Sequence, residues 1–221
     1  MLDLCRIPFS SKDRDERFPL IIAGGPTAFN PEPVADFFDA IVIGDGEEIV
    51  LEICDQVMAW KEGRRRKDDL LKSLSQIEGI YVPSLHPKGK KIRKRLVSDL
   101  NLSPFPTCPI VPYMKVVHDR LNLEIARGCK RGCRFCEAGF IYRPYRERSP
   151  ERIQEVIKLA LRRTGYEEVS LLSLSAGDYS SIGPLLSHLM DCYESKKVAV
   201  SFPSLRIESV MKDRAAEVNR V

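Results

Sequence analysis

The sequence has no apolar run that approaches the roughly 18 to 20 residues needed to cross a bilayer. Its charged first residues lack the apolar core of a signal peptide, and it has no evident repeat or low-complexity segment. Basic and acidic residues nearly balance at 35 against 31, so charge alone does not indicate nucleic-acid binding. These absences predict a cytoplasmic protein with no membrane partner.

The composition is that of a globular protein, with 43% hydrophobic and 30% charged residues. Seven cysteines are present. An odd number in a chain of this length without an export signal argues against a disulfide scaffold. Three of the cysteines lie within eight residues, and in a reducing compartment such grouping indicates metal or cluster ligation.

Two α/β stretches flank a middle segment that is rich in proline. Residues 1–62 contain two short apolar runs, 19–23 and 40–43, that end in glycine turns, and then a helical pattern over residues 47–61. This order predicts buried strands in a parallel sheet. Residues 63–120 hold six prolines and the basic run 88–95, and they are typical of a linker. Residues 121–221 follow the order β-loop-α-β-α-β, which predicts the opening of a (β/α) barrel.

Within the third stretch, one helix has clear start and stop signals. Ser149 is suited to cap a helix that begins at Pro150, and Gly165 is suited to end it. The strands and the second helix are predicted from apolar spacing over residues 121–126, 169–174, 182–193 and 198–202.

A short loop carries Cys129, Cys133 and Cys136 in the spacing C-x3-C-x2-C. Three thiolates on one loop can hold three corners of a cubane iron–sulfur cluster. The fourth iron would then lack a protein ligand, and an open coordination position is what chemistry at a metal requires. Gly128 and Gly132 would let the loop fold tightly around the cluster.

Basic residues in the loop, Lys130, Arg131 and Arg134, are expected to place positive charge beside an anionic cluster. The alternative is a non-catalytic module whose cysteines hold zinc or an electron-transfer cluster, with RNA as a partner of the basic run. Neither Cys108 nor Cys192 completes a zinc-ribbon or ferredoxin spacing with the loop.

The cysteine loop resembles the defining motif of the radical S-adenosylmethionine (SAM) superfamily, including the aromatic Phe135 before the third cysteine. The resemblance implies a [4Fe-4S] cluster whose open iron binds SAM, and reductive cleavage of SAM to methionine and a 5′-deoxyadenosyl radical. It also implies a role of Phe135 in cofactor binding and an electron donor such as flavodoxin or ferredoxin. The substrate and the catalytic residues stay open.

Further contacts to SAM follow from the same resemblance. Ser175, Gly177 and Asp178 stand where the family carries a Gly-Gly-Glu-like segment that contacts the methionine amino group. Ser204 and Arg206 stand where a serine or an arginine meets the carboxylate or ribose of the cofactor. The alternatives are a helix-capping turn at Asp178 and a surface arginine at 206.

Residues 19–60 resemble the second half of a cobalamin-binding-type Rossmann domain, through the glycine-containing segments 23–33 and 40–48. The cobalamin-ligating pattern D-x-H-x-x-G is absent. The resemblance still leaves cobalamin open as a cofactor, because a lower-axial histidine is not universal among these radical enzymes. The whole resembles a radical SAM branch with a cobalamin-binding-like N-terminal domain. The expected fold is therefore α/β, a partial (β/α) radical SAM barrel preceded by part of a Rossmann-like domain. That family is longer at both ends, so we expect a fragment that is incomplete for catalysis alone.

Overall fold

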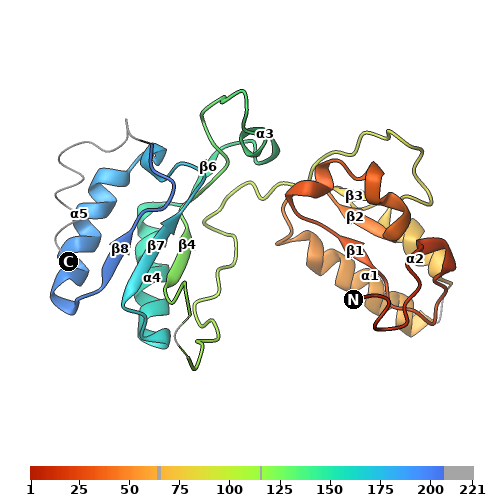
Figure 1. Ribbon diagram of the computed structural model, residues 1–221, viewed down its shortest axis with the longest axis horizontal. Coiled ribbons are helices and arrows are strands. Elements are labelled where there is room, and N and C mark those ends of the chain that lie inside the picture. The colour runs from red at the N-terminus through yellow and green to blue at the C-terminus, as the bar shows by residue number, and fades with distance from the viewer. Residues whose placement is uncertain (64–65, 115, 207–221) are drawn as a thin grey trace. The chain divides into compact units, whose positions relative to one another are not determined.

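The computed structural model describes residues 1–63, 66–114 and 116–206. The chain forms two compact units, Met1–Val97 and Ser98–Val221, each of which is described by itself (Figure 1).

The division between the units falls inside the segment 63–120 that the sequence analysis treated as one linker region. Its first part belongs to unit 1, and its second part belongs to unit 2. None of the helices in the described ranges is both long and apolar enough to span a membrane.

Unit 1 is built on a three-stranded sheet in the order β1-β2-β3. The predicted parallel pairing is confirmed for β1 and β2, but β3 runs antiparallel to β2. Two helices instead of one separate β2 from β3, so the chain enters β3 from the opposite end. The elements are η1 (Ser11–Asp13), β1 (Ile22–Ala23), η2 (Pro26–Phe29), η3 (Glu32–Phe37), β2 (Ala40–Val42), α1 (Ile49–Gly63), α2 (Lys67–Leu74) and β3 (Ile80–Tyr81).

Strand β2 is buried on both faces, as its apolar run predicts. Ala40 and Val42 pack with helices α1 and α2, while Ile41 and Ile43 pack with the 3-10 turns that follow β1. Strand β1 differs from the prediction, because only Ile22 and Ala23 form it and both are half-buried. A strand at the edge of the described sheet has fewer neighbours to cover it.

A buried ion network supports the start of β2. The Asp39 side chain is only 1% exposed and pairs with Arg14 at 3.2 Å and with Lys67 at 2.7 Å. It also accepts a 2.7 Å hydrogen bond from the backbone N–H of Ile21. One carboxylate therefore holds the N-terminal segment, strand β2 and helix α2 together.

Unit 2 contains a parallel sheet in the order β4-β7-β8 and a separate antiparallel pair, β5 with β6. The predicted alternation of strands and helices is confirmed. The elements are β4 (Leu121–Glu124), β5 (Ala126–Arg127), α3 (Ala138–Ile141), β6 (Arg146–Glu147), α4 (Pro150–Thr164), β7 (Glu168–Leu172), η4 (Ala176–Asp178), α5 (Ile182–Tyr193), η5 (Glu194–Lys196) and β8 (Ala199–Ser201).

Helix α4 begins and ends at the residues that its capping signals predict. The Ser149 hydroxyl accepts a hydrogen bond from the N–H of Arg152 at 3.2 Å, and Pro150 occupies the first helical position. Gly165 closes the helix in the left-handed conformation with φ 72°.

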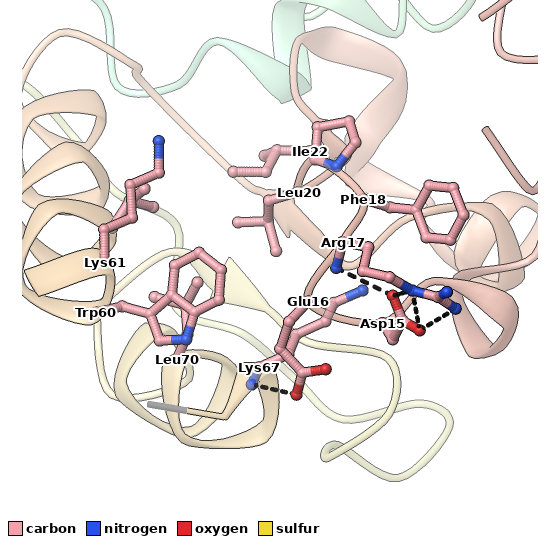
Figure 2. A pocket seen from close by; sticks show the side chains of 12 residues that line it. Asp15, Glu16, Arg17, Phe18, Leu20, Ile22, Trp60, Lys61, Lys67 and Leu70 are labelled. Atoms are coloured by element: carbon pink, nitrogen blue, oxygen red, sulfur yellow. Dashed lines mark hydrogen bonds and ion pairs between the residues drawn. The ribbon is translucent and has the colours of Figure 1, made fainter. Parts of the chain in front are cut away.

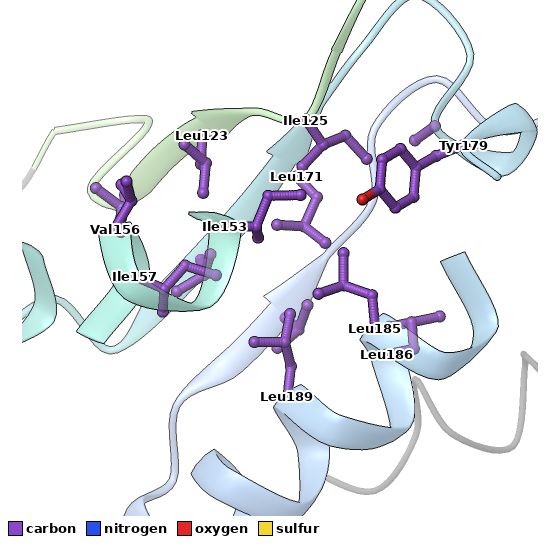
Figure 3. Packing of buried hydrophobic residues seen from close by; sticks show 14 of the residues in the cluster. Leu123, Ile125, Ile153, Val156, Ile157, Leu171, Tyr179, Leu185, Leu186 and Leu189 are labelled. Atoms are coloured by element: carbon purple, nitrogen blue, oxygen red, sulfur yellow. The ribbon is translucent and has the colours of Figure 1, made fainter. Parts of the chain in front are cut away.

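The core of unit 2 lies between the parallel sheet and helices α4 and α5. Figure 3 shows Leu123 and Leu171 of the strands among side chains of both helices, such as Ile153 and Leu189. The intervening strand residues are outside this cluster, because successive side chains of a strand point to opposite faces. Right-handed crossovers between strands that neighbour one another in chain order place both helices on the same face.

Candidate cluster and cofactor site

The loop of three cysteines begins directly after β5, beside the carboxyl end of β4. Cys129, Cys133 and Cys136 are free thiols, and each is partly buried. Within the loop, the N–H of Arg131 donates to the Cys129 sulfur at 3.4 Å, and the N–H of Cys136 donates to the carbonyl of Cys133 at 3.0 Å.

The donor set fits a cubane cluster by its chemistry, since three unpaired thiols stand on one short loop. Over residues 1–63, 66–114 and 116–206, no three His, Cys, Asp or Glu side chains are placed to hold a single metal ion.

Gly128 fixes the start of this loop against the chain that returns from it. Its φ is 92°, and a Cβ atom there would lie 2.7 Å from the carbonyl oxygen of Tyr142 and 3.0 Å from the Cα of Tyr145. Both neighbours are backbone atoms, which cannot move aside as a flexible side chain can. Only glycine both adopts this positive φ without strain and leaves the space beside Tyr142 and Tyr145 free of a Cβ atom.

Replacing Gly128 by alanine is therefore expected to lower the free energy of unfolding of unit 2 by about 2 kcal/mol. Urea unfolding followed by circular dichroism measures the change. Gly132→Ala is the matched control, because a Cβ atom at Gly132 meets nothing within 4 Å and should cost less than about 0.5 kcal/mol. Equal effects of the two substitutions would contradict the close approach at Gly128.

Asp178 lies against the cysteine loop. Its carboxylate accepts two hydrogen bonds from Arg131, from Nε at 2.9 Å and from Nη2 at 2.5 Å, and one from the Ser175 hydroxyl at 2.9 Å. The Arg131 guanidinium lowers the pKa of Asp178 to about 2, against the opposing effect of burial. Asp178 is thus ionised over the whole physiological pH range.

A second contact holds the same loop. The Lys130 ammonium lies 3.5 Å from Glu147 and 4.4 Å from the centre of the Tyr145 ring. Glu147 also accepts hydrogen bonds from the Tyr145 hydroxyl at 2.7 Å and from both the N–H and the hydroxyl of Ser180. Burial opposes ionisation of Glu147, but the hydrogen bonds from Ser180 and Tyr145 lower its pKa.

These contacts change the expected role of the basic residues in the loop. The sequence analysis assigned the positive charge of Lys130, Arg131 and Arg134 to the cluster. In the structure, Lys130 and Arg131 are paired with Glu147 and Asp178. Arg134 is exposed and has no hydrogen bond or ion pair with the part of the chain that is described.

Of the other residues predicted to contact the cofactor, some lie beside the cysteine loop or Asp178, and others are exposed. Arg206 Nη1 lies 3.7 Å from the sulfur of Cys133, which brings the segment after β8 to the cysteine loop. Ser175 is buried and bound to Asp178, and Gly177 lies with Asp178 in the 3-10 turn η4. Ser204 is exposed, and the Phe135 side chain is 93% exposed.

The structure adds residues that the sequence analysis did not assign to the site. Glu147 and Tyr145 hold the loop through Lys130, and Arg131 binds Asp178 across 47 positions of the chain. No short-range pattern links residues so far apart, so only the tertiary structure reveals these pairs.

A cavity of about 260 Å³ lies at the carboxyl ends of β4 and β7. Glu124 and Arg127 line it and bind each other through two hydrogen bonds of 2.8 Å. Gly128 and Tyr142 of the cysteine loop line it as well. Ligands of open α/β sheets commonly bind at this end of the strands.

Unit 1 has a larger cavity, of about 590 Å³. Figure 2 shows Leu20, Ile22 and Trp60 facing its opening, with Lys61 nearby. The glycine turns at 24–25 and 44–46, which carry the resemblance to a cobalamin-binding domain, do not line it. The histidine of unit 1, His86, stacks on Tyr81 and accepts a hydrogen bond from the N–H of Val82 at 3.1 Å. Cobalamin is therefore not supported as a cofactor.

The fold and the site define an α/β protein with a cysteine loop beside a parallel sheet. Two families of known proteins match this chain. Residues 1–83 match the family "Radical SAM proteins, N-terminal", and residues 123–221 match the "Radical SAM superfamily". Both matches are to radical SAM families, and one falls in each unit.

Three curated proteins are similar to parts of this chain. The chain is 27% identical to an uncharacterized protein of Methanocaldococcus jannaschii, over 88% of this chain and 39% of that protein. It is 28% identical to an anaerobic magnesium-protoporphyrin IX monomethyl ester cyclase of Rubrivivax gelatinosus, over 58% of this chain and 23% of that enzyme. It is 27% identical to a ribosomal protein uS12 methylthiotransferase of Elusimicrobium minutum, over 53% of this chain and 30% of that enzyme. The chain thus spans less than two fifths of the length of each relative.

Proposed function

We propose that this chain is part of a radical SAM enzyme in which Cys129, Cys133 and Cys136 hold a [4Fe-4S] cluster and the neighbouring segments bind SAM. When bound and reduced, such a cluster supplies the electron that cleaves SAM to methionine and a 5′-deoxyadenosyl radical. The two radical SAM domains support this reaction class. The electron donor would be a protein of the flavodoxin or ferredoxin type.

One observation carries the proposal: the segments that follow three neighbouring parallel strands meet at one place. The cysteine loop follows β4 and the short β5, Asp178 follows β7, and Arg206 follows β8. Asp178 binds the loop through Arg131, and Arg206 reaches the sulfur of Cys133. Parallel strands bring their carboxyl ends to the same edge of a sheet.

In this proposal the residues around the loop divide the recognition of SAM between them. The Asp178 carboxylate suits the cofactor's ammonium group, and the Arg206 guanidinium suits its carboxylate. Ser175 holds Asp178 in place, and Gly177 lets the backbone approach the cofactor closely. The exposed ring of Phe135 is available for apolar contact with the cofactor.

The same proposal includes a partial (β/α) barrel. Helices α4 and α5 share one face of the sheet β4-β7-β8, as the helices of such a barrel do. The opposite face carries polar residues such as Asn122, Glu124 and Ser170, and in a barrel this face would line the interior. The interior would then include the cavity beside Glu124 and Arg127.

The RNA-associated alternative has less support. In the basic run, Arg95 pairs with Glu48 and Glu52, and Arg93 pairs with Glu78. Side chains engaged in this way within unit 1 present less free positive charge to a phosphate backbone.

Anaerobic reconstitution of the chain with iron and sulfide tests the proposed function. We expect about four irons per chain. An intact version of the enzyme is expected to release 5′-deoxyadenosine when SAM and a strong reductant are added. X-ray absorption should show cysteine sulfur as the only protein ligand of the iron. Stoichiometric zinc with no uptake of iron would overturn the proposal and favour a purely structural metal site.

A further inference from the structure

We infer that Arg131 is a positioning residue, which fixes the cysteine loop at a set separation from Asp178 so that one SAM molecule can reach both the cluster and this carboxylate. The inference rests on the proposed function and extends it to a residue between the first two cysteines. Arg131 lies two positions from Cys129 and two from Cys133, and it contacts Asp178 directly.

The geometry of the contact supports positioning rather than general attraction between opposite charges. Nε and Nη2 of Arg131 each donate to a different oxygen of Asp178, at 2.9 and 2.5 Å, which is the two-pronged arrangement of a guanidinium on a carboxylate. The Asp178 side chain is 11% exposed, and the Ser175 hydroxyl donates to Oδ2, the oxygen that also accepts from Arg131 Nε. The carboxylate is therefore held in one orientation by groups from two segments.

The loop is tied down at the adjacent position as well. Lys130 binds Glu147, and Glu147 binds Ser180, two residues beyond Asp178. The residues between the first two cysteines thus make two parallel connections to the segment after β7. A ligand that bridges the loop and this segment binds more tightly when their separation is already set, because less conformational freedom is lost on binding.

Five variants of the full chain, each reconstituted with iron, test the inference. The dissociation constant of SAM is measured by equilibrium dialysis, and iron is measured chemically. Arg131→Ala is expected to keep the wild-type iron content and to bind SAM about tenfold more weakly. Without the contact between Arg131 and Asp178, the separation of the loop from Asp178 is no longer set before SAM binds. Arg131→Lys keeps the positive charge but cannot form the paired hydrogen bonds of a guanidinium with both oxygens of Asp178. It is therefore expected to recover only part of the affinity for SAM.

Arg134→Ala is the matched control, because it removes the same charge from the same loop at an exposed position without a described partner. It is expected to bind SAM as the wild type does. Asp178→Ala combined with Arg131→Ala is expected to bind no more weakly than Asp178→Ala alone, because both substitutions remove the same contact.

Three results would overturn the inference: unchanged or tighter SAM binding by Arg131→Ala, an equal loss in Arg134→Ala, or loss of iron in Arg131→Ala, which would make the residue a requirement for the cluster itself. Failure of the wild-type chain to take up iron, or to bind SAM once loaded, would instead overturn the proposed function. The two failures are therefore distinguishable.

Discussion

Replacing Cys133 by alanine is expected to leave the reconstituted chain almost without iron, against about four irons in the wild type. A cubane that has lost one of three protein ligands has two corners left on the protein, and the loop offers no replacement. Chemical iron analysis and the visible absorbance of the cluster measure the loss. Arg206 Nη1 lies 3.7 Å from this sulfur, so the substitution also removes its contact with the loop.

The control is Cys108→Ala, in which an exposed cysteine outside the loop is removed. Its iron content is expected to equal that of the wild type. A comparable loss in Cys108→Ala would show that four cysteines hold the metal, and the open iron on which the proposed function depends would then be absent.

Replacing Asp39 by alanine is expected to destabilise unit 1 by about 3 to 5 kcal/mol. The substitution leaves two buried cations, Arg14 and Lys67, without their shared carboxylate. It also leaves the N–H of Ile21 without the acceptor it has at 2.7 Å. A buried charge that has lost its partner retains the cost of desolvation without the compensating attraction.

The single tryptophan makes this change measurable in unit 1 alone. Trp60 lies at the end of α1, and its ring N–H binds the carbonyl of Arg66 beside Lys67. Urea unfolding followed by tryptophan fluorescence therefore reports the loss of this unit. Asp55→Ala, at an exposed position of α1 without a described partner, is expected to shift the transition by less than about 0.5 kcal/mol. Equal shifts for the two variants would show that the network around Asp39 adds little stability.

Much of unit 2 could be predicted from local signals. Ser149, Pro150 and Gly165 mark the ends of α4, because capping depends on hydrogen bonds between neighbouring residues. The apolar spacing over residues 182–193 predicts α5 with the bounds that the structure shows. Capping hydrogen bonds and helical spacing involve residues a few positions apart, so the helices that they define can be predicted from the order of residues alone.

Unit 1 shows where this approach fails. The buried strand expected from Pro19 forms only at Ile22 and Ala23 and is half-buried, because strand exposure depends on neighbours from distant parts of the chain. Strand β3 is antiparallel because of the two helices that precede it, and the apolar run at Ile80 carries no information on direction.

The candidate site likewise has one part that the sequence predicts and another that only the tertiary structure reveals. The order of residues alone predicts Cys129, Cys133 and Cys136 as a ligand set, because the number of thiols and their spacing are properties of one short loop. Folding was needed to join Arg131 to Asp178 and Lys130 to Glu147, since ion pairs between residues 47 and 17 positions apart depend on how the strands are arranged. A sequence can thus carry the chemistry of a site, while the separation and orientation of its charged groups arise from packing.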